Sequence, residues 1–382
     1  MADFIRTLVS TLETSMNSSA KITILQTIVP NYREPLFRGL SQVFAPDFTL
    51  CAGERGFFGL INTSPSARDL ITPLENKYLN HPLLLWQKNL PPAAYDADVL
   101  VAEFCLRSVS TWRLLAARRR RGLPTILWGH TSGEHEASKV IGNWMLRQAS
   151  GFITYTNSEA DELRKRFTGK PVIAAPNAVM FAQDCSFLPA PGDEVADILY
   201  SGRLIADKKL GLMLHGWRLA LEQSLVPANA RLILIGEGPE NERLRAIARQ
   251  SPLTRDRVHF AGIITETARL REKYRTCLAT CSPGYVGLAA IQSICFGVPV
   301  VVADKEPHSP EIEACREGET ALLFRAGDPQ DLAVKFGTLF KERRAWLERR
   351  PAITAFARKN YTLDAMISSF REIISRCANP RT

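Results

Sequence analysis

Residues 282–301, SPGYVGLAAIQSICFGVPVV, decide the fold. An apolar run ends at Ser282, a glycine-containing loop follows, and an almost wholly apolar helix is predicted over Leu288–Phe296. Gly297 closes that helix and Pro299 precedes a second apolar run, a pattern typical of a helix between two buried strands. Such a helix is too apolar to be exposed. Its N-terminal amides, reinforced by the helix dipole, therefore predict an anion site.

The rest of the chain repeats this alternation of short apolar runs and amphipathic stretches, which is the pattern of parallel βαβ units. We expect strands at 22–29, 48–51, 98–104, 125–128, 152–155, 172–175, 198–201, 232–235, 258–261, 277–281, 298–303 and 321–324. We expect helices at 35–44, 109–121, 136–149, 158–167, 211–223, 239–249, 266–274, 288–296 and 330–341. The predicted fold class is α/β, with two Rossmann-like doubly wound domains facing across a cleft.

A segment without periodicity, residues 181–196, is rich in Pro, Ala, Gly and acidic residues and predicts an interdomain linker. The tail after Arg350 returns to helical spacing, and we expect its helices to pack back on the first domain. The predicted division is an N-terminal tail (1–20), an N-terminal Rossmann-like domain (21–180), the linker, a C-terminal Rossmann-like domain (197–350) and C-terminal helices (351–382).

The N-terminal tail leaves two interpretations open. Phe4, Leu8 and Leu12 lie at helical spacing, but Asp3 and Glu13 exclude the continuous apolar centre of a secretory signal. One interpretation is a weakly docked helix, and the other is an anchor on a membrane surface. No stretch of the chain approaches the roughly 20 apolar residues of a membrane span.

The net charge of +9 and pI of about 9.2 suit an anionic partner: nucleic acid, acidic lipid or a phosphorylated small molecule. Nucleic acid is disfavoured because the basic residues form no aromatic-interleaved motif. Arg118–Arg121, at the end of a predicted helix, is either a solvated helix end or a contact with acidic membrane. We expect a cytoplasmic protein, with peripheral attachment to the inner face of the plasma membrane as the second option.

Cysteines and acidic pairs predict neither disulfides nor a metal. The eight cysteines are scattered without a CxxC pair, so we expect reduced, buried thiols. Asp96-Ala97-Asp98 imitates a metal-binding pair, but it directly precedes an apolar run and is expected to be the turn before a strand. His130 and His135 lack the HExxH order. We predict no metal and no cofactor.

Two loops of the second domain are candidates for the ligand site: one carries possible phosphate ligands, and the other is a glycine turn that would let a ligand come close to the backbone. Arg203 and Lys208 follow the first strand, where Arg offers a planar fork to phosphate and Lys a point charge; a solvated basic loop is the alternative. The segment 232–239, LILIGEGP, is half of a dinucleotide fingerprint whose third glycine is replaced by Asn241. We expect a tight turn here, with Pro239 as the first helical residue.

These motifs together resemble the retaining GT-B glycosyltransferases of family 4. The resemblance rests on GRLxxxK from residue 202, LILIGxGP from 232, VHFAG from 258 and PxxxGLxxxQxxxxGVPVV from 283, and it is closest over 197–326. It implies transfer of a sugar, with retention, from a nucleoside-diphosphate-sugar to a sugar or lipid-linked saccharide, in bacterial-type polysaccharide or glycolipid assembly. It is looser at 128–130, 156–158 and 176–179.

The resemblance also assigns roles. Arg203 and Lys208 would hold the donor diphosphate and neutralise the leaving group, and His130 would contact the donor sugar at the reaction centre. Amides of Val286, Gly287 and Leu288 would bind the distal phosphate. The nucleobase would be lined by Phe260, Gly262, Ile263 and Ile264.

This sequence departs from the family at two positions. The family carries two glutamates eight positions apart, one on the donor sugar and one on the ribose, where Gly284 and Gln292 stand here. Gln292 can bond a ribose hydroxyl, whereas Gly284 has no side chain. Glu311 is a candidate sugar contact, although Glu near a helix start also suits the dipole.

The loop after the first strand supplies Tyr32 and Arg33, which would contact the acceptor or a donor phosphate; a structural turn before a helix is the alternative. Two other functions stay open. A sugar-nucleotide isomerase would require carboxylates that Gly284 and Gln292 do not provide. A non-catalytic binding protein of the same fold would have lost the glutamate pair.

Overall fold

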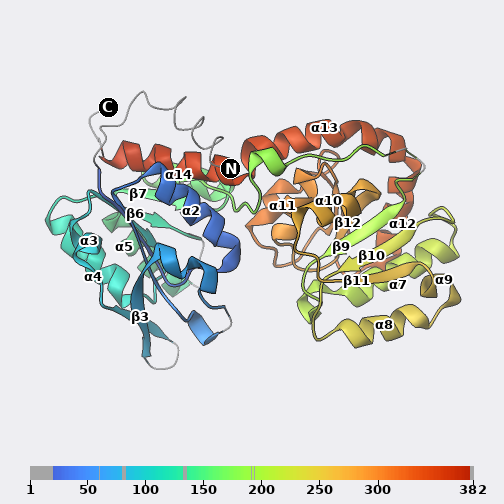
Figure 1. Ribbon diagram of the computed structural model, residues 1–382, viewed down its shortest axis with the longest axis horizontal. Helices are drawn as coiled ribbons and strands as arrows, with labels where there is room; N and C mark the ends of the chain where they lie inside the picture. Colours follow the sequence, from blue (N-terminus) through green and yellow to red (C-terminus); the bar gives the residue numbers. More distant parts are fainter. Residues whose placement is uncertain are drawn as a thin grey trace. The chain divides into compact units, whose positions relative to one another are not determined.

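The computed structural model describes residues 20–59, 61–79, 83–131, 136–190, 192 and 194–378. The chain forms two compact units: unit 1 contains Met1–Pro176 and Asp364–Thr382, and unit 2 contains Asn177–Leu363. Both are parallel-sheet α/β units, as the sequence predicts (Figure 1). The helix expected in the N-terminal tail lies outside the described residues.

The sheet of unit 1 has the order β4-β3-β2-β1-β5-β6-β7-β8, and only the β3–β4 pair is antiparallel. The order reverses between β1 and β5, so the loops that follow these strands form the edge where doubly wound sheets bind ligands. The strands are β1 (Ile22–Gln26), β2 (Phe48–Gly53), β3 (Ile71–Leu79), β4 (Leu84–Lys88), β5 (Val99–Glu103), β6 (Thr125–Trp128), β7 (Gly151–Thr154) and β8 (Val172–Ala174).

The last helix of the chain completes unit 1. Phe370 packs edge-on against Trp128, with ring centroids 4.8 Å apart, and Ile367 lies against Gly39 of α2. Figure 1 shows this helix, α14, beside α2. The helical elements of unit 1 are η1 (Asn31–Arg33), α2 (Glu34–Val43), η2 (Phe57–Gly59), η3 (Pro65–Leu70), α3 (Pro92–Asp96), α4 (Val109–Arg120), α5 (Glu136–Gln148), α6 (Asn157–Arg166) and α14 (Leu363–Ala378).

The β3–β4 hairpin has no counterpart in the sequence prediction. Along β3, buried positions do not recur at every second residue, and most side chains are at least partly exposed. Pro73 lies inside β3, which a sequence reading takes as evidence against a strand. β3, which lies between β2 and the edge strand β4, therefore lacks the continuous apolar run by which the buried strands were recognised.

Unit 2 has the sheet order β11-β10-β9-β12-β13-β14, all parallel, which is the dinucleotide-binding order with its switch point between β9 and β12. Its strands are β9 (Asp197–Ser201), β10 (Arg231–Ile235), β11 (Val258–Gly262), β12 (Cys277–Ser282), β13 (Val300–Ala303) and β14 (Ala321–Phe324). Its helical elements are η4 (Ala182–Asp184), η5 (Ala206–Lys208), α7 (Leu210–Glu222), α8 (Asn241–Arg249), α9 (Pro252–Arg255), α10 (Thr267–Arg275), α11 (Leu288–Cys295), η6 (Pro310–Ala314), α12 (Pro329–Lys341) and α13 (Arg343–Asn360).

Most element boundaries differ from prediction by one to three residues, and two of these differences have local reasons. Helix α8 begins at Asn241, so Pro239 is not its first residue, because the amide of Glu240 turns back to the carbonyl of Leu204. Strand β13 begins at Val300 because the amide of Val298 turns back to Ser293 and closes the end of α11. The eight cysteines are all free, and six are buried.

Candidate functional site

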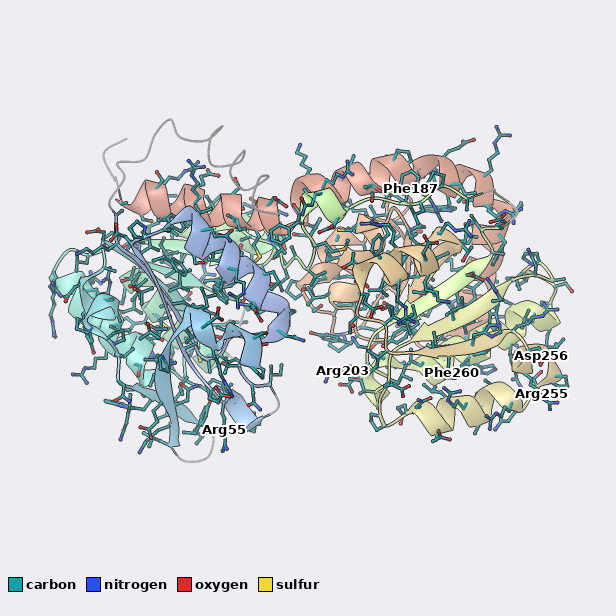
Figure 2. The ribbon with its side chains drawn as sticks, viewed as in Figure 1. Arg55, Phe187, Arg203, Arg255, Asp256 and Phe260 are labelled. Atoms are coloured by element: carbon teal, nitrogen blue, oxygen red, sulfur yellow. The ribbon has the colours of Figure 1, made fainter. Side chains whose placement is uncertain are left out.

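The loop after β9 is held between two other loops at the carboxyl edge of the unit 2 sheet. The amide of Leu204 donates to Glu237 O at 2.9 Å, and the amide of Tyr285 donates to Asp207 O at 3.1 Å. A Cβ on Gly238 would lie 2.3 Å from Leu204 O, so only glycine permits this approach. The half-fingerprint glycines thus serve close backbone packing. Arg203, labelled in Figure 2, belongs to the clamped loop.

Lys208 reaches from this loop to the loop that precedes α11. Its Nζ donates to Tyr285 O at 2.6 Å and lies 4.7 Å from the Tyr285 ring centroid. The same Nζ is 3.8 Å from the point where a Cβ of Gly287 would lie. Burial, and then the charge of Arg203, lower the pKa of Lys208. Arg203 is exposed and has no side-chain partner among the described residues.

Helix α11 begins beside this ammonium group. Gly287 is its N-cap and Leu288 its first residue, and in the described part of the chain neither amide has an acceptor. The amide of Val286 instead donates to His308 Nδ1 at 3.2 Å. The structure therefore brings Lys208 together with two open amides, and the third amide of the predicted set is already engaged.

His308 and Ser309 hold the loop from behind. His308 Nε2 lies 2.9 Å from Ala303 O, so it donates there while Nδ1 accepts from Val286, which selects the neutral tautomer protonated on Nε2. The Ser309 hydroxyl donates to Val286 O at 2.6 Å. Sequence reasoning assigned no role to either residue, although both lie within three positions of the candidate Glu311.

Glu311 is 5% exposed and its carboxylate is used inside the protein. Oε1 accepts from Asn177 Nδ2 at 2.9 Å, and Oε2 lies against the Ser309 hydroxyl. Asn177 comes from the 176–179 segment that carried part of the looser resemblance. Glu311 therefore braces the loops around Val286, and its negative charge acts on Lys208 from within unit 2.

Gly284 and Gln292, the two positions where the resemblance would place glutamates, differ in their surroundings. At Gly284 a Cβ would lie 2.3 Å from Asp207 O and 2.9 Å from Lys208 C, so backbone occupies the space of a side chain. Gln292 is partly exposed on α11 and makes no side-chain hydrogen bond to the described residues. Gln292 is free to meet a ligand, whereas Gly284 contributes only backbone.

The predicted nucleobase segment lies at the end of β11 in the same sheet. Phe260 is partly exposed, and the Arg245 guanidinium stands 4.4 Å from its ring centroid. Gly262 has φ +68° and accepts from the Gly236 amide, while Ile263 is 67% exposed and Ile264 packs partly on the core. Arg245 was not predicted, because no motif marks a surface arginine of α8. Figure 2 labels Phe260.

In unit 1, His130 follows β6 and is oriented by Glu159. His130 Nδ1 lies 3.3 Å from Glu159 Oε1, and its ring is 4.7 Å from that of Tyr155. Glu159 also accepts from the Thr131 amide and from the Thr156 hydroxyl, both at 3.2 Å. Burial raises the pKa of Glu159, but these hydrogen bonds outweigh it and the net pKa is lowered. Glu159 escaped sequence reasoning because it looks like an ordinary helix cap.

Arg33 follows β1 and lies on aromatic rings of the same unit. Its guanidinium carbon is 4.5 Å from the Trp128 ring centroid and 5.1 Å from that of Tyr155, and Nη2 donates to Tyr155 Oη at 2.6 Å. Tyr32, its neighbour in η1, lies 5.7 Å from the same guanidinium. Arg33 and His130 thus both contact Tyr155.

The membrane contact considered for the basic block Arg118–Arg121 is wrong for Arg118. Arg118 is 0% exposed and binds the carbonyls of Tyr95, Ala97 and Pro124 and the hydroxyl of Thr125, so it cannot meet a membrane. Burial lowers its pKa to about 10. Arg121 pairs with Asp96 at 2.6 Å. The helical spacing places Arg118 on the inner face of α4, which the block of like charges concealed.

The described residues contain no group of three or more metal-ligating side chains. None of the helices in the described ranges is long and apolar enough to cross a membrane.

Comparisons with known proteins identify one family and several proteins that this chain resembles. The family described as Glycosyl transferases group 1 matches residues 195–342. The sulfoquinovosyl transferase SQD2 of Arabidopsis thaliana is 24% identical over 273 residues, which are 66% of this chain and 51% of that protein. The chain thus spans about half the length of this curated relative.

Solved structures of low identity share the fold over nearly the whole chain. HepE of Anabaena in complex with UDP is 16% identical, with a TM-score of 0.64 and coverage of 93% of this chain and 99% of that one. A glycosyltransferase from Rickettsia africae has a TM-score of 0.67 at 13% identity, covering 95% and 100%. The lipopolysaccharide outer core galactosyltransferase WaaB has a TM-score of 0.66 at 16% identity, covering 93% and 99%. The chain therefore has the GT-B fold, and its residues 195–342 match the family described as Glycosyl transferases group 1.

Proposed function

We propose that the protein is a glycosyltransferase that moves a sugar from a nucleoside diphosphate to a hydroxyl acceptor with retention of anomeric configuration. The observation that carries this proposal is the site at the β9–β12 switch point, where Lys208 Nζ lies beside the open amides of Gly287 and Leu288. A cation and a helix N-terminus at one sheet edge suit a diphosphate. HepE, which has the same fold, has been solved with UDP and with UDP-glucose.

In the proposed reaction the bond between the anomeric carbon and the diphosphate oxygen breaks, and the diphosphate leaves with the electron pair. Lys208, Arg203 and the two amides stabilise this growing negative charge, so the step requires no metal. The acceptor oxygen bonds to the anomeric carbon on the face the diphosphate leaves, and its proton passes to a departing phosphate oxygen. His130 would contact the donor sugar, and Gln292 the ribose.

The test is a panel of nucleotide sugars scored by acceptor-dependent release of nucleoside diphosphate, followed by analysis of the product anomer. Retention with release that requires an acceptor would support the proposal. An inverted anomer would overturn the retaining mechanism. Interconversion of the donor without an acceptor would indicate an isomerase.

A second candidate is a non-catalytic nucleotide-sugar-binding protein. The observation that favours it is Gly284, where the Asp207 carbonyl occupies the space of a carboxylate side chain. Calorimetry with the same donor panel separates the two. Donor binding without turnover, over a broad acceptor panel, would favour the binding protein.

Peripheral contact with an acidic membrane is a further part of the proposal, and it involves unit 1. Val140 and Trp144 on α5 are 68% and 61% exposed, and Trp144 stacks on Trp112 of α4 at 4.8 Å. Exposed Arg147 and Arg120 lie on the same two helices. Apolar side chains among cations suit an anionic lipid surface. Flotation with vesicles of acidic lipid, against vesicles of neutral lipid, tests this contact.

A further inference from the structure

We propose that Arg33 binds an anionic group, a phosphate or carboxylate, of the acceptor substrate. The inference rests on the proposed function, because it needs an acceptor. The inference specifies that the acceptor carries a negative charge. The proposed donor site in unit 2 does not require this.

The first ground is the unused hydrogen-bonding capacity of Arg33. Among the described residues, its guanidinium makes one hydrogen bond, to Tyr155 Oη, and no ion pair. Its Nε is buried without a partner, while the residue as a whole is partly exposed. The charge of Glu103 acts on Arg33, but the Glu103 carboxylate accepts hydrogen bonds from the amide and hydroxyl of Thr27 and not from Arg33.

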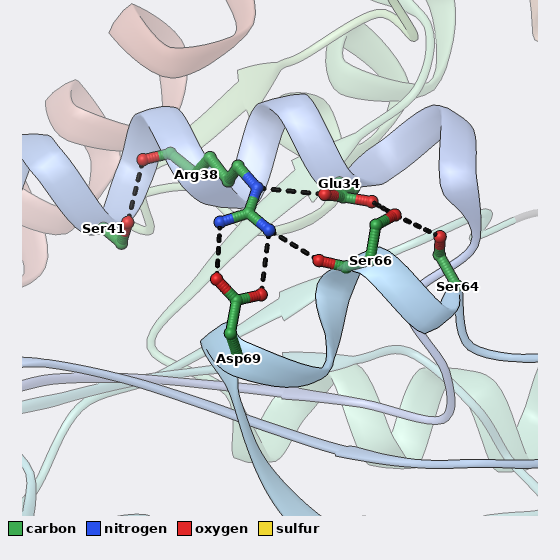
Figure 3. Close-up of polar contacts among 6 residues, drawn as sticks. All are labelled: Glu34, Arg38, Ser41, Ser64, Ser66 and Asp69. Atoms are coloured by element: carbon green, nitrogen blue, oxygen red, sulfur yellow. Dashed lines mark hydrogen bonds and ion pairs between the residues drawn. The ribbon is translucent and has the colours of Figure 1, made fainter.

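In two other arginines of unit 1, the guanidinium donates hydrogen bonds to several acceptors. Arg118, which is fully buried, binds several backbone carbonyls. Arg38 donates to Glu34 Oε1 at 2.9 Å, to Asp69 Oδ1 at 2.8 Å and to Ser66 O at 2.6 Å (Figure 3). Arg33 has no comparable set of acceptors, although it lies only five positions from Arg38 in the chain.

The second ground is that Arg33 is held in place without being neutralised. Its guanidinium lies against Trp128, which is 1% exposed, and against Tyr155. Cation–π contacts of this kind recover less free energy than the removal of an ion from water costs. An arriving oxyanion would meet a fork already oriented, and bidentate binding is the geometry that Arg favours over Lys.

The third ground is position. Arg33 follows β1 and Tyr155 follows β7, so both stand at the carboxyl edge of the unit 1 sheet. Tyr155 also contacts the ring of His130, which the proposed reaction places at the donor sugar. An acceptor anchored through its anion on Arg33 would therefore have its neutral hydroxyl part on the side of His130.

The test measures binding of inorganic phosphate by the full chain, in a Lys208→Ala background that removes the cation of the proposed donor site. Phosphate is titrated against chloride at equal ionic strength, and the melting temperature is followed. We expect phosphate to raise the melting temperature. The concentration for half of this effect should rise about tenfold or more with Arg33→Gln, the scale of one lost charge-assisted contact.

Arg38→Gln is the matched control, since it removes the same charge from the same segment and leaves Arg33 in place. It should shift the phosphate concentration by less than about twofold. Arg33→Lys, which keeps the charge and loses the fork, serves if Arg33→Gln fails to fold, and it should bind phosphate more weakly than the wild type. An unchanged phosphate response in the Arg33 variants would overturn the proposal.

A separate titration of UDP into Arg33→Gln, with Lys208 intact, distinguishes acceptor from donor. Unchanged UDP affinity supports an acceptor site, and a loss of about tenfold would assign Arg33 to the donor and overturn the inference. The readouts are independent of turnover. If no donor is ever transferred, the proposed function fails while the phosphate site can still be observed.

Discussion

The carbonyl oxygen of Asp207 lies 2.3 Å from the point that a Cβ of Gly284 would occupy. The amide of the next residue, Tyr285, donates to the same oxygen at 3.1 Å. Position 284, where the resemblance predicts a glutamate, therefore cannot simply take that side chain, because the backbone of η5 fills its place.

A glutamate side chain at position 284 should destabilise the protein. We expect Gly284→Glu, and also Gly284→Ala, to destabilise unit 2 by about 1–3 kcal/mol through displacement of the Asp207–Lys208 backbone. Urea unfolding measures this. Gly287→Ala is the comparison, because its Cβ would meet only Lys208 Nζ at 3.8 Å. A stable Gly284→Glu variant with raised donor affinity would contradict the close approach.

Lys208→Ala should cut turnover by roughly tens to hundreds of fold, the scale of losing one charge contact to the transition state. The matched control is Lys209→Asn, which removes the neighbouring charge where Lys209 pairs with Glu306 at 2.5 Å and has φ +49°. Asparagine tolerates that backbone. Steady-state kinetics of both variants should separate them clearly, and equal rates would remove the assigned diphosphate site.

The lowered pKa of Lys208 also has a consequence for binding. Burial lowers the pKa below 10.5 in the free protein, and a bound diphosphate would raise it again. Nucleotide binding should therefore take up protons at alkaline pH, and affinity should fall as the pH rises past the lowered pKa. Calorimetry in buffers of different ionisation enthalpy detects this uptake. If the Lys208→Ala variant still takes up protons on nucleotide binding, another group is responsible for the uptake.

Glu159→Gln tests the orientation of His130. Because the net pKa of Glu159 is lowered from 4.5, its ionised form stabilises the fold above pH 4.5, and this stability is lost as the pH falls through the lowered pKa. The variant should show a weaker acid dependence of unfolding and about tenfold lower turnover. Asp161→Asn, which removes an exposed carboxylate of the same helix, is the control.

A nitrogen NMR measurement separates positioning from mere stability. In the wild type we expect the neutral His130 ring to carry its proton on Nδ1, facing Glu159 Oε1. Glu159→Ala should shift the ring toward a mixture of tautomers. An unchanged tautomer would contradict the positioning role even if the variant is less stable.

Arg118 should matter for stability and not for membranes. Arg118→Leu leaves the carbonyls of Tyr95, Ala97 and Pro124 buried without their donor, so we expect a loss of about 3 kcal/mol in the free energy of unfolding. Arg120→Leu, at an exposed position of the same helix, should change stability by less than about 0.5 kcal/mol. Urea unfolding compares the two.

Much of the architecture was already determined by the sequence alone. Buried parallel strands are continuous apolar runs, so β6 and β14 were predicted to the residue. The runs of β9 and β12 likewise located the switch-point loops that carry Arg203, Lys208 and Gly287. The hairpin of β3 and β4 was missed because β3 is largely exposed and carries no such run, and the short apolar run of β4, Leu84–Trp86, was not assigned to a strand.

Only the tertiary structure decided what the individual polar groups do. Backbone packing explains Gly284, an acceptor from a distant loop occupies the Val286 amide, and buried carbonyls claim Arg118. Each outcome depends on neighbours that are far away in the chain. Residue type and spacing specify which groups reach a sheet edge, but hydrogen-bond satisfaction, which requires the folded neighbours, determines which of them stay available to a ligand.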